Sequence, residues 1–194
     1  MTDLRAGAGA DAGLPQSASS LASVPKSPSP SPIWVAFATA GGLGYAPVAP
    51  GTFGAAGGVG LFAALALVLP ATPVAGLVVA SLTGAILLVG ARASTRAECH
   101  FGRHDDGRIV VDEVAGQLAA LLPIAALAPQ RMLEPAPLLL GFLTFRLLDI
   151  WKPGPVRLAE QRFEAGWGVM LDDVVAGLLA GLVVTSSLLA GWLP

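Results

Sequence analysis

Residues 27–91 include no charged side chain, and this run restricts the chain to few folds. Only 12% of the 194 residues are charged, against about 25% in a soluble domain, and the mean hydropathy is +0.71. Because hydrocarbon accepts uncharged segments and excludes unpaired charge, these properties indicate a multi-pass membrane protein. The net charge of −2 gives no reason to expect a nucleic-acid partner. The single Cys99 excludes an internal disulfide and a cysteine-based metal cage.

The apolar segments predict an all-α, multi-helix membrane bundle. Residues 1–32 are rich in Ser, Pro and Ala, so we expect a disordered tail before one helical domain at 33–194. A bilayer core needs about 20 helical residues, with a lower limit of about 17. Five segments approach or exceed that length: 54–69, 73–91, 109–128, 135–151 and 169–193. A further apolar stretch at 33–39 is too short to span, and we expect it at the interface or as a re-entrant piece.

The basic residues are distributed unevenly between the links. If the five segments alternate, links 92–108 and 152–168 lie on the same side of the membrane as the tail. Those two links hold Arg92, Arg96, Arg103, Arg108, Lys152, Arg157 and Arg162, whereas the opposite links hold only Arg131. The positive-inside rule then makes the basic side cytoplasmic. The same side receives all the unusual polar motifs, so we expect the motif loops on the cytoplasmic face.

The first motif, GGLGYAPVAPGTFG, precedes the first long segment. Glycines such as Gly51 let backbone approach a ligand closely, and Thr52 is a suitable N-cap residue. A helix N-terminus with free N–H groups can bind an anion, so the motif predicts a phosphate cradle. A tight turn followed by an ordinary cap is the alternative.

The second motif, RHDDGRIVVDEVAG, combines a loop with the start of an apolar segment. His104 and Asp105 belong to the loop, whereas Asp112 and Glu113 fall in the first turns of the expected helix. Carboxylates beside an imidazole suit acid–base chemistry or a hard cation. The alternatives are a polar turn and two acidic residues favoured by the helix dipole.

Two further motifs place charge at the same ends of apolar segments. In FRLLDIWKPGPVR, Arg146 and Asp149 are three residues apart and share a helix face, and Lys152 precedes two prolines that stop the helix. An intrahelical ion pair is the alternative there. In GWGVMLDDVVAG, Asp172 and Asp173 open an apolar helix, and small residues at four-residue spacing from Asp173 predict a packing face.

Together these motifs predict a metal site. The carboxylates of Asp112, Glu113, Asp149, Asp172 and Asp173 come from three segments and are expected at one membrane depth. Crowded carboxylates repel one another, and a divalent cation relieves the repulsion. With oxygen ligands and no cysteine, Mg²⁺ is the expected metal. Arg146 and Lys152 add positive potential, which suits a phosphate-bearing lipid.

With these four motifs in this order, the chain resembles the phosphatidylglycerophosphatase A family of bacterial inner-membrane lipid phosphatases. The resemblance covers about residues 33–192. It implies an all-helical enzyme that needs Mg²⁺ and removes the terminal phosphate of phosphatidylglycerophosphate to give phosphatidylglycerol. It also places the family's Asp-Glu pair at Asp112 and Glu113, its Asp and Lys at Asp149 and Lys152, its Asp-Asp pair at Asp172 and Asp173, and its Pro-Gly-Thr turn at residues 50–52.

On this interpretation the five carboxylates bind Mg²⁺, and Gly51, Thr52, Arg146 and Lys152 bind the substrate phosphate. His104 or Asp105 protonates the leaving oxygen. Attack by water and a covalent phospho-aspartate both stay open.

Three other functions stay open: a transporter that uses the carboxylates as a cation or proton site, a lipid phosphotransferase, and an inactive homologue. The acids cluster at one face and no inverted repeat is visible, which disfavours the transporter. The sequence does not determine the oligomeric state.

Overall fold

The computed structural model describes residues 31–104, 106–163 and 166–192. The expected tail at 1–32 lies outside these residues, apart from its last two. Over the described ranges the chain forms helices and no strand, which confirms the all-α prediction. In chain order the elements are α1 (Pro32–Ala38), η1 (Ala40–Tyr45), α2 (Pro50–Val68), α3 (Val74–Phe101), α4 (Val111–Leu127), η2 (Pro129–Arg131), α5 (Pro135–Trp151), α6 (Gly154–Arg162) and α7 (Gly166–Leu189).

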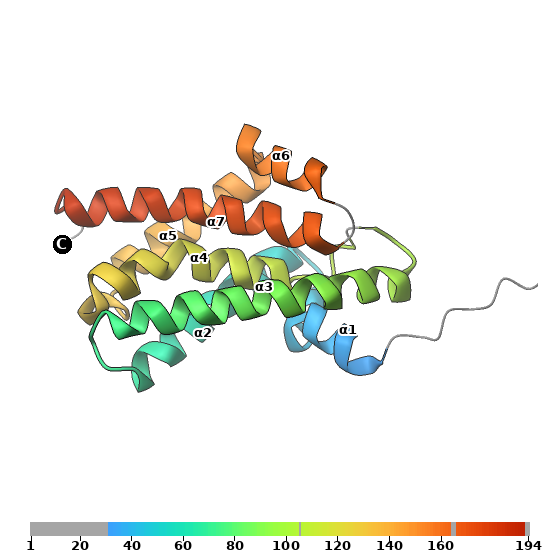
Figure 1. Ribbon diagram of the computed structural model, residues 1–194, viewed down its shortest axis with the longest axis horizontal. Coiled ribbons are helices and arrows are strands. Elements are labelled where there is room, and N and C mark those ends of the chain that lie inside the picture. Colours follow the sequence, from blue (N-terminus) through green and yellow to red (C-terminus); the bar gives the residue numbers. More distant parts are fainter. Residues whose placement is uncertain (1–30, 105, 164–165, 193–194) are drawn as a thin grey trace, which may run out of the picture.

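Helix α4 is the centre of the bundle and packs against α2, α3, α5 and α7 (Figure 1). Small residues on both helices let α4 and α7 approach closely. A Cβ added at Gly177 of α7 would lie only 2.9 Å from the carbonyl carbon of Gly116 on α4, too close for a larger side chain. The neighbouring Gly181 faces Ala119 in the same way. The predicted packing face that continues from Asp173 along α7 is therefore confirmed, and it faces α4.

Three helices, α2, α3 and α7, are long and apolar enough to cross a membrane by length and composition. The other two expected spans, α4 and α5, have 17 residues each, which is the lower limit of about 17 for a span. Helix α5 still presents an apolar stripe outward, since Leu139, Leu143 and Leu147 are all exposed. Exposed leucines at four-residue spacing are typical of a helix face that meets lipid or another protein.

Two of the expected links contain helix. Helix α3 continues past residue 91 to Phe101, because residues 92–101 include no Gly or Pro and Gly102 ends the helix with a φ of 69°. The link after α5 contains α6, which starts with a proline in its first turn. The short stretch expected at 33–39 forms α1, which packs against α3.

The start of α2, the start of α4, the start of α7 and the ends of α3 and α5 lie at the same end of the bundle (Figure 1). The four motifs therefore meet in space at this end, called the motif-loop end below.

Candidate active site

Three carboxylates, two buried and one half-buried, form the centre of the motif-loop end. Asp112 and Glu113 occupy the first turn of α4, and Asp173 projects from α7. One oxygen from each side chain lies within 4.8 Å of the others. Asp112 Oδ1, Glu113 Oε2 and Asp173 Oδ2 are buried and have no hydrogen-bond partner among the described residues. Because a buried ionised oxygen without a partner is costly, this arrangement fits a divalent cation bound by all three.

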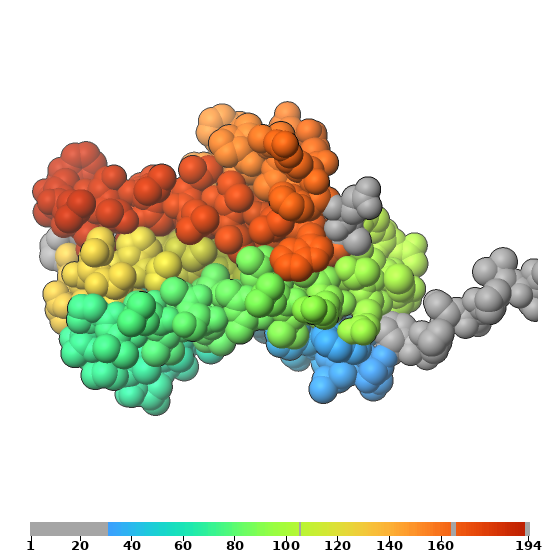
Figure 2. Space-filling model, viewed as in Figure 1, coloured from blue at the N-terminus to red at the C-terminus, as the bar shows by residue number. Residues whose placement is uncertain are grey.

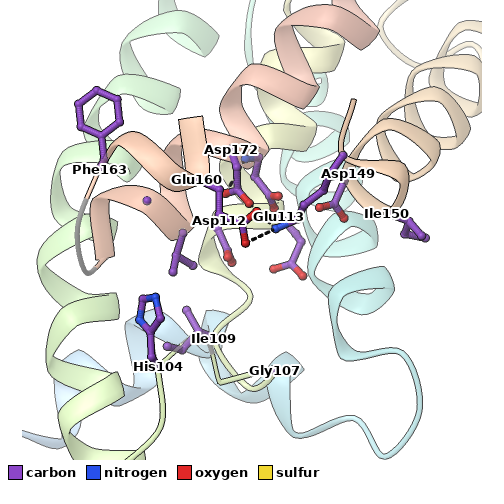
Figure 3. A pocket seen from close by; sticks show the side chains of 14 residues that line it. His104, Gly107, Ile109, Asp112, Glu113, Asp149, Ile150, Glu160, Phe163 and Asp172 are labelled. Atoms are coloured by element: carbon purple, nitrogen blue, oxygen red, sulfur yellow. Dashed lines mark hydrogen bonds and ion pairs between the residues drawn. The ribbon is translucent and has the colours of Figure 1, made fainter. Parts of the chain in front are cut away.

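An open cavity of about 280 Å³ adjoins these carboxylates (Figure 3). All five carboxylates predicted as metal ligands line it: Asp112, Glu113, Asp149, Asp172 and Asp173. A sixth, Glu160, enters from α6, and Lys152 supplies the opposite charge. Six acids beside one lysine would repel a phosphate anion unless a bound cation offset their charge.

Lys152 lies between two acids at the end of α5. Its Nζ is 2.7 Å from Asp172 Oδ2 and 3.0 Å from Glu160 Oε1. Burial alone would lower the pKa of the ammonium, but hydrogen bonds and attraction from Asp172 and Glu160 outweigh it and raise that pKa above the ordinary value. Lys152 also has a φ of 46°, a left-handed conformation that non-glycine residues rarely adopt. Because of the raised pKa the side chain keeps its charge, and its Nζ reaches Asp172 on α7.

Arg146 forms ion pairs with two of the carboxylates, Asp149 and Glu113. Its Nη1 lies 2.7 Å from Asp149 Oδ2 and 4.0 Å from Glu113 Oε1, so the ion pair suggested by the spacing is confirmed. Unlike Lys152, Arg146 does not line the cavity.

The motif predicted as a phosphate cradle, at the start of α2, instead packs against Glu113 and Arg146 through Gly51. A Cβ at Gly51 would clash with Glu113 Oε1 and lie 3.1 Å from Arg146 Nη2. Neither Gly51 nor Thr52 lines the cavity. The expectation that Thr52 is the N-cap is wrong, because α2 already begins at Pro50 and no side chain caps it. Proline is favoured in the first turn, where its missing N–H costs no hydrogen bond.

His104 lies at the edge of the cavity. Its Nδ1 is 2.6 Å from Glu98 Oε1, and its side chain is 73% exposed. Asp105, the other predicted proton donor, lies outside the described residues. The next residue, Asp106, does not line the cavity and accepts two side-chain hydrogen bonds from Arg108.

Glu160 in the cavity wall and Gln117, a buried amide on α4 that does not line the cavity, do not follow from the sequence interpretation. Glu160 belongs to α6, a helix within a segment predicted only as a link. Gln117 is fully buried one turn after Glu113, and neither atom of its amide has a partner in the described part of the chain. The sequence does carry a signal for Gln117, because it is the one amide in an otherwise apolar run four residues from an acid.

Comparison with known proteins adds independent information. The family model described as Phosphatidylglycerophosphatase A matches residues 36–187. The chain is 34% identical to the phosphatidylglycerophosphatase A of Haemophilus influenzae over 74% of its own length and 81% of that protein. It is 33% identical to the phosphatidylglycerophosphatase A of Escherichia coli over 76% of its own length and 78% of that protein.

A third relative carries a different name. The chain is 35% identical to a Bacteroides thetaiotaomicron protein described as a candidate phosphatidylinositol-3-phosphatase, over 80% of its own length and 93% of that protein. No solved structure matches the chain.

Proposed function

The chain belongs to the phosphatidylglycerophosphatase A family, and on that premise we propose that it hydrolyses the terminal phosphate monoester of phosphatidylglycerophosphate to release phosphatidylglycerol. One observation carries the proposal: three partnerless carboxylate oxygens adjoin an open cavity at one end of an apolar bundle, within the part of the chain that the structure describes. A phosphate headgroup can reach that cavity while acyl chains stay beside the exposed leucines of the helices.

The proposed cofactor is Mg²⁺. Asp112, Glu113 and Asp173 would hold it, with Asp149 and Asp172 completing the cavity wall. Mg²⁺ prefers oxygen ligands, and it is usually bound by a few carboxylates together with phosphate oxygens of the substrate. When bound, Mg²⁺ would neutralise phosphate oxygens and favour attack at phosphorus.

The chain's own cations have separate roles in this proposal. Lys152 lines the cavity and donates to a phosphate oxygen, for which its permanent charge suits it. Arg146 holds Asp149 and Glu113 in place from behind. His104, at the cavity edge, is the proposed proton donor to the leaving glycerol oxygen. Water and an aspartate both remain candidates for the attacking group.

We place the protein in the bacterial inner membrane with the motif-loop end in the cytoplasm. The support is the excess of arginine and lysine in the segments at this end. The proposed partner is a phospholipid substrate. Transporter function is less favoured, because the acids that line the cavity all lie at one end of the helices and do not continue along them.

The test is phosphate release by the purified full-length protein in detergent, with Mg²⁺ or with chelator. We expect release from phosphatidylglycerophosphate to need both Mg²⁺ and Asp173. Asp173→Asn should abolish it, and Glu134→Gln, an acid at the opposite end of the bundle, should retain it. Mg²⁺ should also raise the melting temperature of wild type but not of Asp173→Asn, a readout independent of turnover.

Phosphatidylinositol 3-phosphate belongs in the same assay, because one relative is described as a candidate phosphatidylinositol-3-phosphatase. Faster phosphate release from that lipid than from phosphatidylglycerophosphate would change the proposed substrate but not the proposed reaction, hydrolysis of a phosphate monoester. Equal release in chelator would contradict the metal assignment.

A further inference from the structure

A second polar groove lies at the motif-loop end, between α3 and the start of α7. It has a volume of about 290 Å³ and is lined by Ala91, Arg92, Thr95, Arg96 and Trp167. It shares no lining residue with the carboxylate cavity. Figure 2 shows the face on which α3 (green) and α7 (orange to red) come together.

The floor of this groove is fixed by close helix contact. The backbone N–H of Gly166 donates to Thr95 Oγ1 at 3.1 Å, and that hydroxyl donates to the Ala91 carbonyl at 2.9 Å. A Cβ at Gly166 would lie 2.8 Å from the Thr95 nitrogen. The groove therefore keeps its shape without a ligand.

The two arginines have N–H groups left for an anion, although Arg92 Nη1 also donates to the Leu88 carbonyl at 3.3 Å. Arg92 and Arg96 are one helical turn apart on α3, and both are exposed. In the described part of the chain neither forms an ion pair, whereas three other arginines each pair with a carboxylate: Arg108, Arg131 and Arg146. Arg96 instead stacks on Trp34, with Cζ 4.2 Å from the ring centre. Stacking orients a guanidinium and leaves its N–H groups free for a phosphate.

The depth of the groove matches the membrane interface. From Val74 to Arg92, α3 rises about 27 Å, close to the thickness of about 30 Å of a hydrocarbon core. Trp167 is 40% exposed at this level, and tryptophan is favoured at the boundary between chains and headgroups. One turn deeper, Leu88 is 52% exposed and offers a surface for an acyl chain.

We propose that this groove binds the phosphate-bearing headgroup of an anionic phospholipid, at a site separate from the carboxylate cavity. The phosphate lies between Arg92 and Arg96, and the acyl chains descend past Leu88. Basic pockets between membrane helices have the right charge for such lipids. The proposal does not depend on the hydrolytic activity.

The test uses the full-length protein in neutral detergent with chelator present, so that the carboxylate cavity repels an anionic headgroup. The probes are dioctanoyl phosphatidylglycerol, dioctanoyl phosphatidylcholine and inorganic phosphate, and the readout is the melting temperature. We expect phosphatidylglycerol alone to raise it. Arg92→Gln/Arg96→Gln should raise the half-saturating concentration about thirtyfold.

Two further variants keep the outcome interpretable. Arg162→Gln removes an exposed charge at the end of α6 and should bind as wild type does. Arg92→Lys/Arg96→Lys keeps both charges and should bind with intermediate affinity, because lysine lacks the bidentate fork. Equal shifts in wild type and the double Gln variant, equal shifts with phosphatidylcholine, or an equal shift with inorganic phosphate would each overturn the proposal.

Discussion

Gly51 determines how closely α2 can approach the carboxylates. Any Cβ at this position would collide with the carboxylate of Glu113, one of the three proposed metal ligands. We expect Gly51→Ala to displace Glu113 and to lower the rate of phosphate release on the order of tenfold or more, since small displacements of catalytic groups are costly. The measurement is the turnover rate beside the helix content by circular dichroism.

The matched control for Gly51 is in the same helix. A Cβ added at Gly60 would have no atom within 4 Å, so Gly60→Ala should leave turnover unchanged. Equal loss in both variants would show that α2 tolerates no added methyl and would contradict the specific contact with Glu113.

Asp106 provides a pH-dependent contribution to stability. Hydrogen bonds from the Arg108 side chain, the closest at 2.7 Å, outweigh burial and lower the pKa of the Asp106 carboxyl. A carboxyl whose pKa falls on folding stabilises the folded state above its unfolded value of about 3.9, and this stabilisation is lost as the pH falls through the folded value.

We therefore expect Asp106→Asn to melt below wild type at pH 7, and the two melting curves to converge as the pH falls below about 3.9. Arg108→Gln should show the same convergence, because it removes the other half of the pair. A difference that stays constant down to acid pH would mean that charge does not contribute.

At the scale of elements, the contact between α4 and α7 sets the separation of the acids. Gly177 of α7 lies against the Gly116 carbonyl, one turn from Asp173. Gly177→Ala should force the helices apart, reduce the free energy of unfolding by about 1–3 kcal/mol and weaken Mg²⁺ binding. Chemical denaturation and Mg²⁺ titration measure the two effects.

Gly84 of α3 is the control for this contact, because a Cβ there meets no atom within 4 Å. Gly84→Ala should be neutral or slightly stabilising, since alanine favours helix over glycine. If Gly177→Ala behaves like Gly84→Ala, the α4–α7 contact is looser than described.

At the scale of the whole molecule, the orientation in the membrane can be tested with the native chain. Its single cysteine, Cys99, is exposed in the last turn of α3 at the motif-loop end. We expect a membrane-impermeant maleimide to label Cys99 in inside-out vesicles and not in intact spheroplasts. The control is Cys99→Ser/Ala71→Cys, whose thiol lies at the opposite end and should show the reverse pattern. Labelling of Cys99 from outside would invert the proposed orientation.

The sequence by itself determined the class of fold and singled out the acids that the structure brings together around one cavity. The uncharged run at 27–91 and the apolar segments indicated helices, because a helix satisfies its backbone hydrogen bonds within one segment, as hydrocarbon demands. The Asp-Glu and Asp-Asp pairs were identified because charge at the end of an apolar helix is costly without a function.

Only the tertiary structure decided which charges face the cavity. Lys152 and Glu160 enter it, whereas Arg146 supports the acids from behind, and spacing along one helix cannot distinguish these positions. The structure also places Gly51 against Glu113, and neither Gly51 nor Thr52 lines the cavity as a phosphate cradle would. Periodicity reports which face of a helix a residue occupies, but what lies opposite that face depends on contacts between segments distant in the chain.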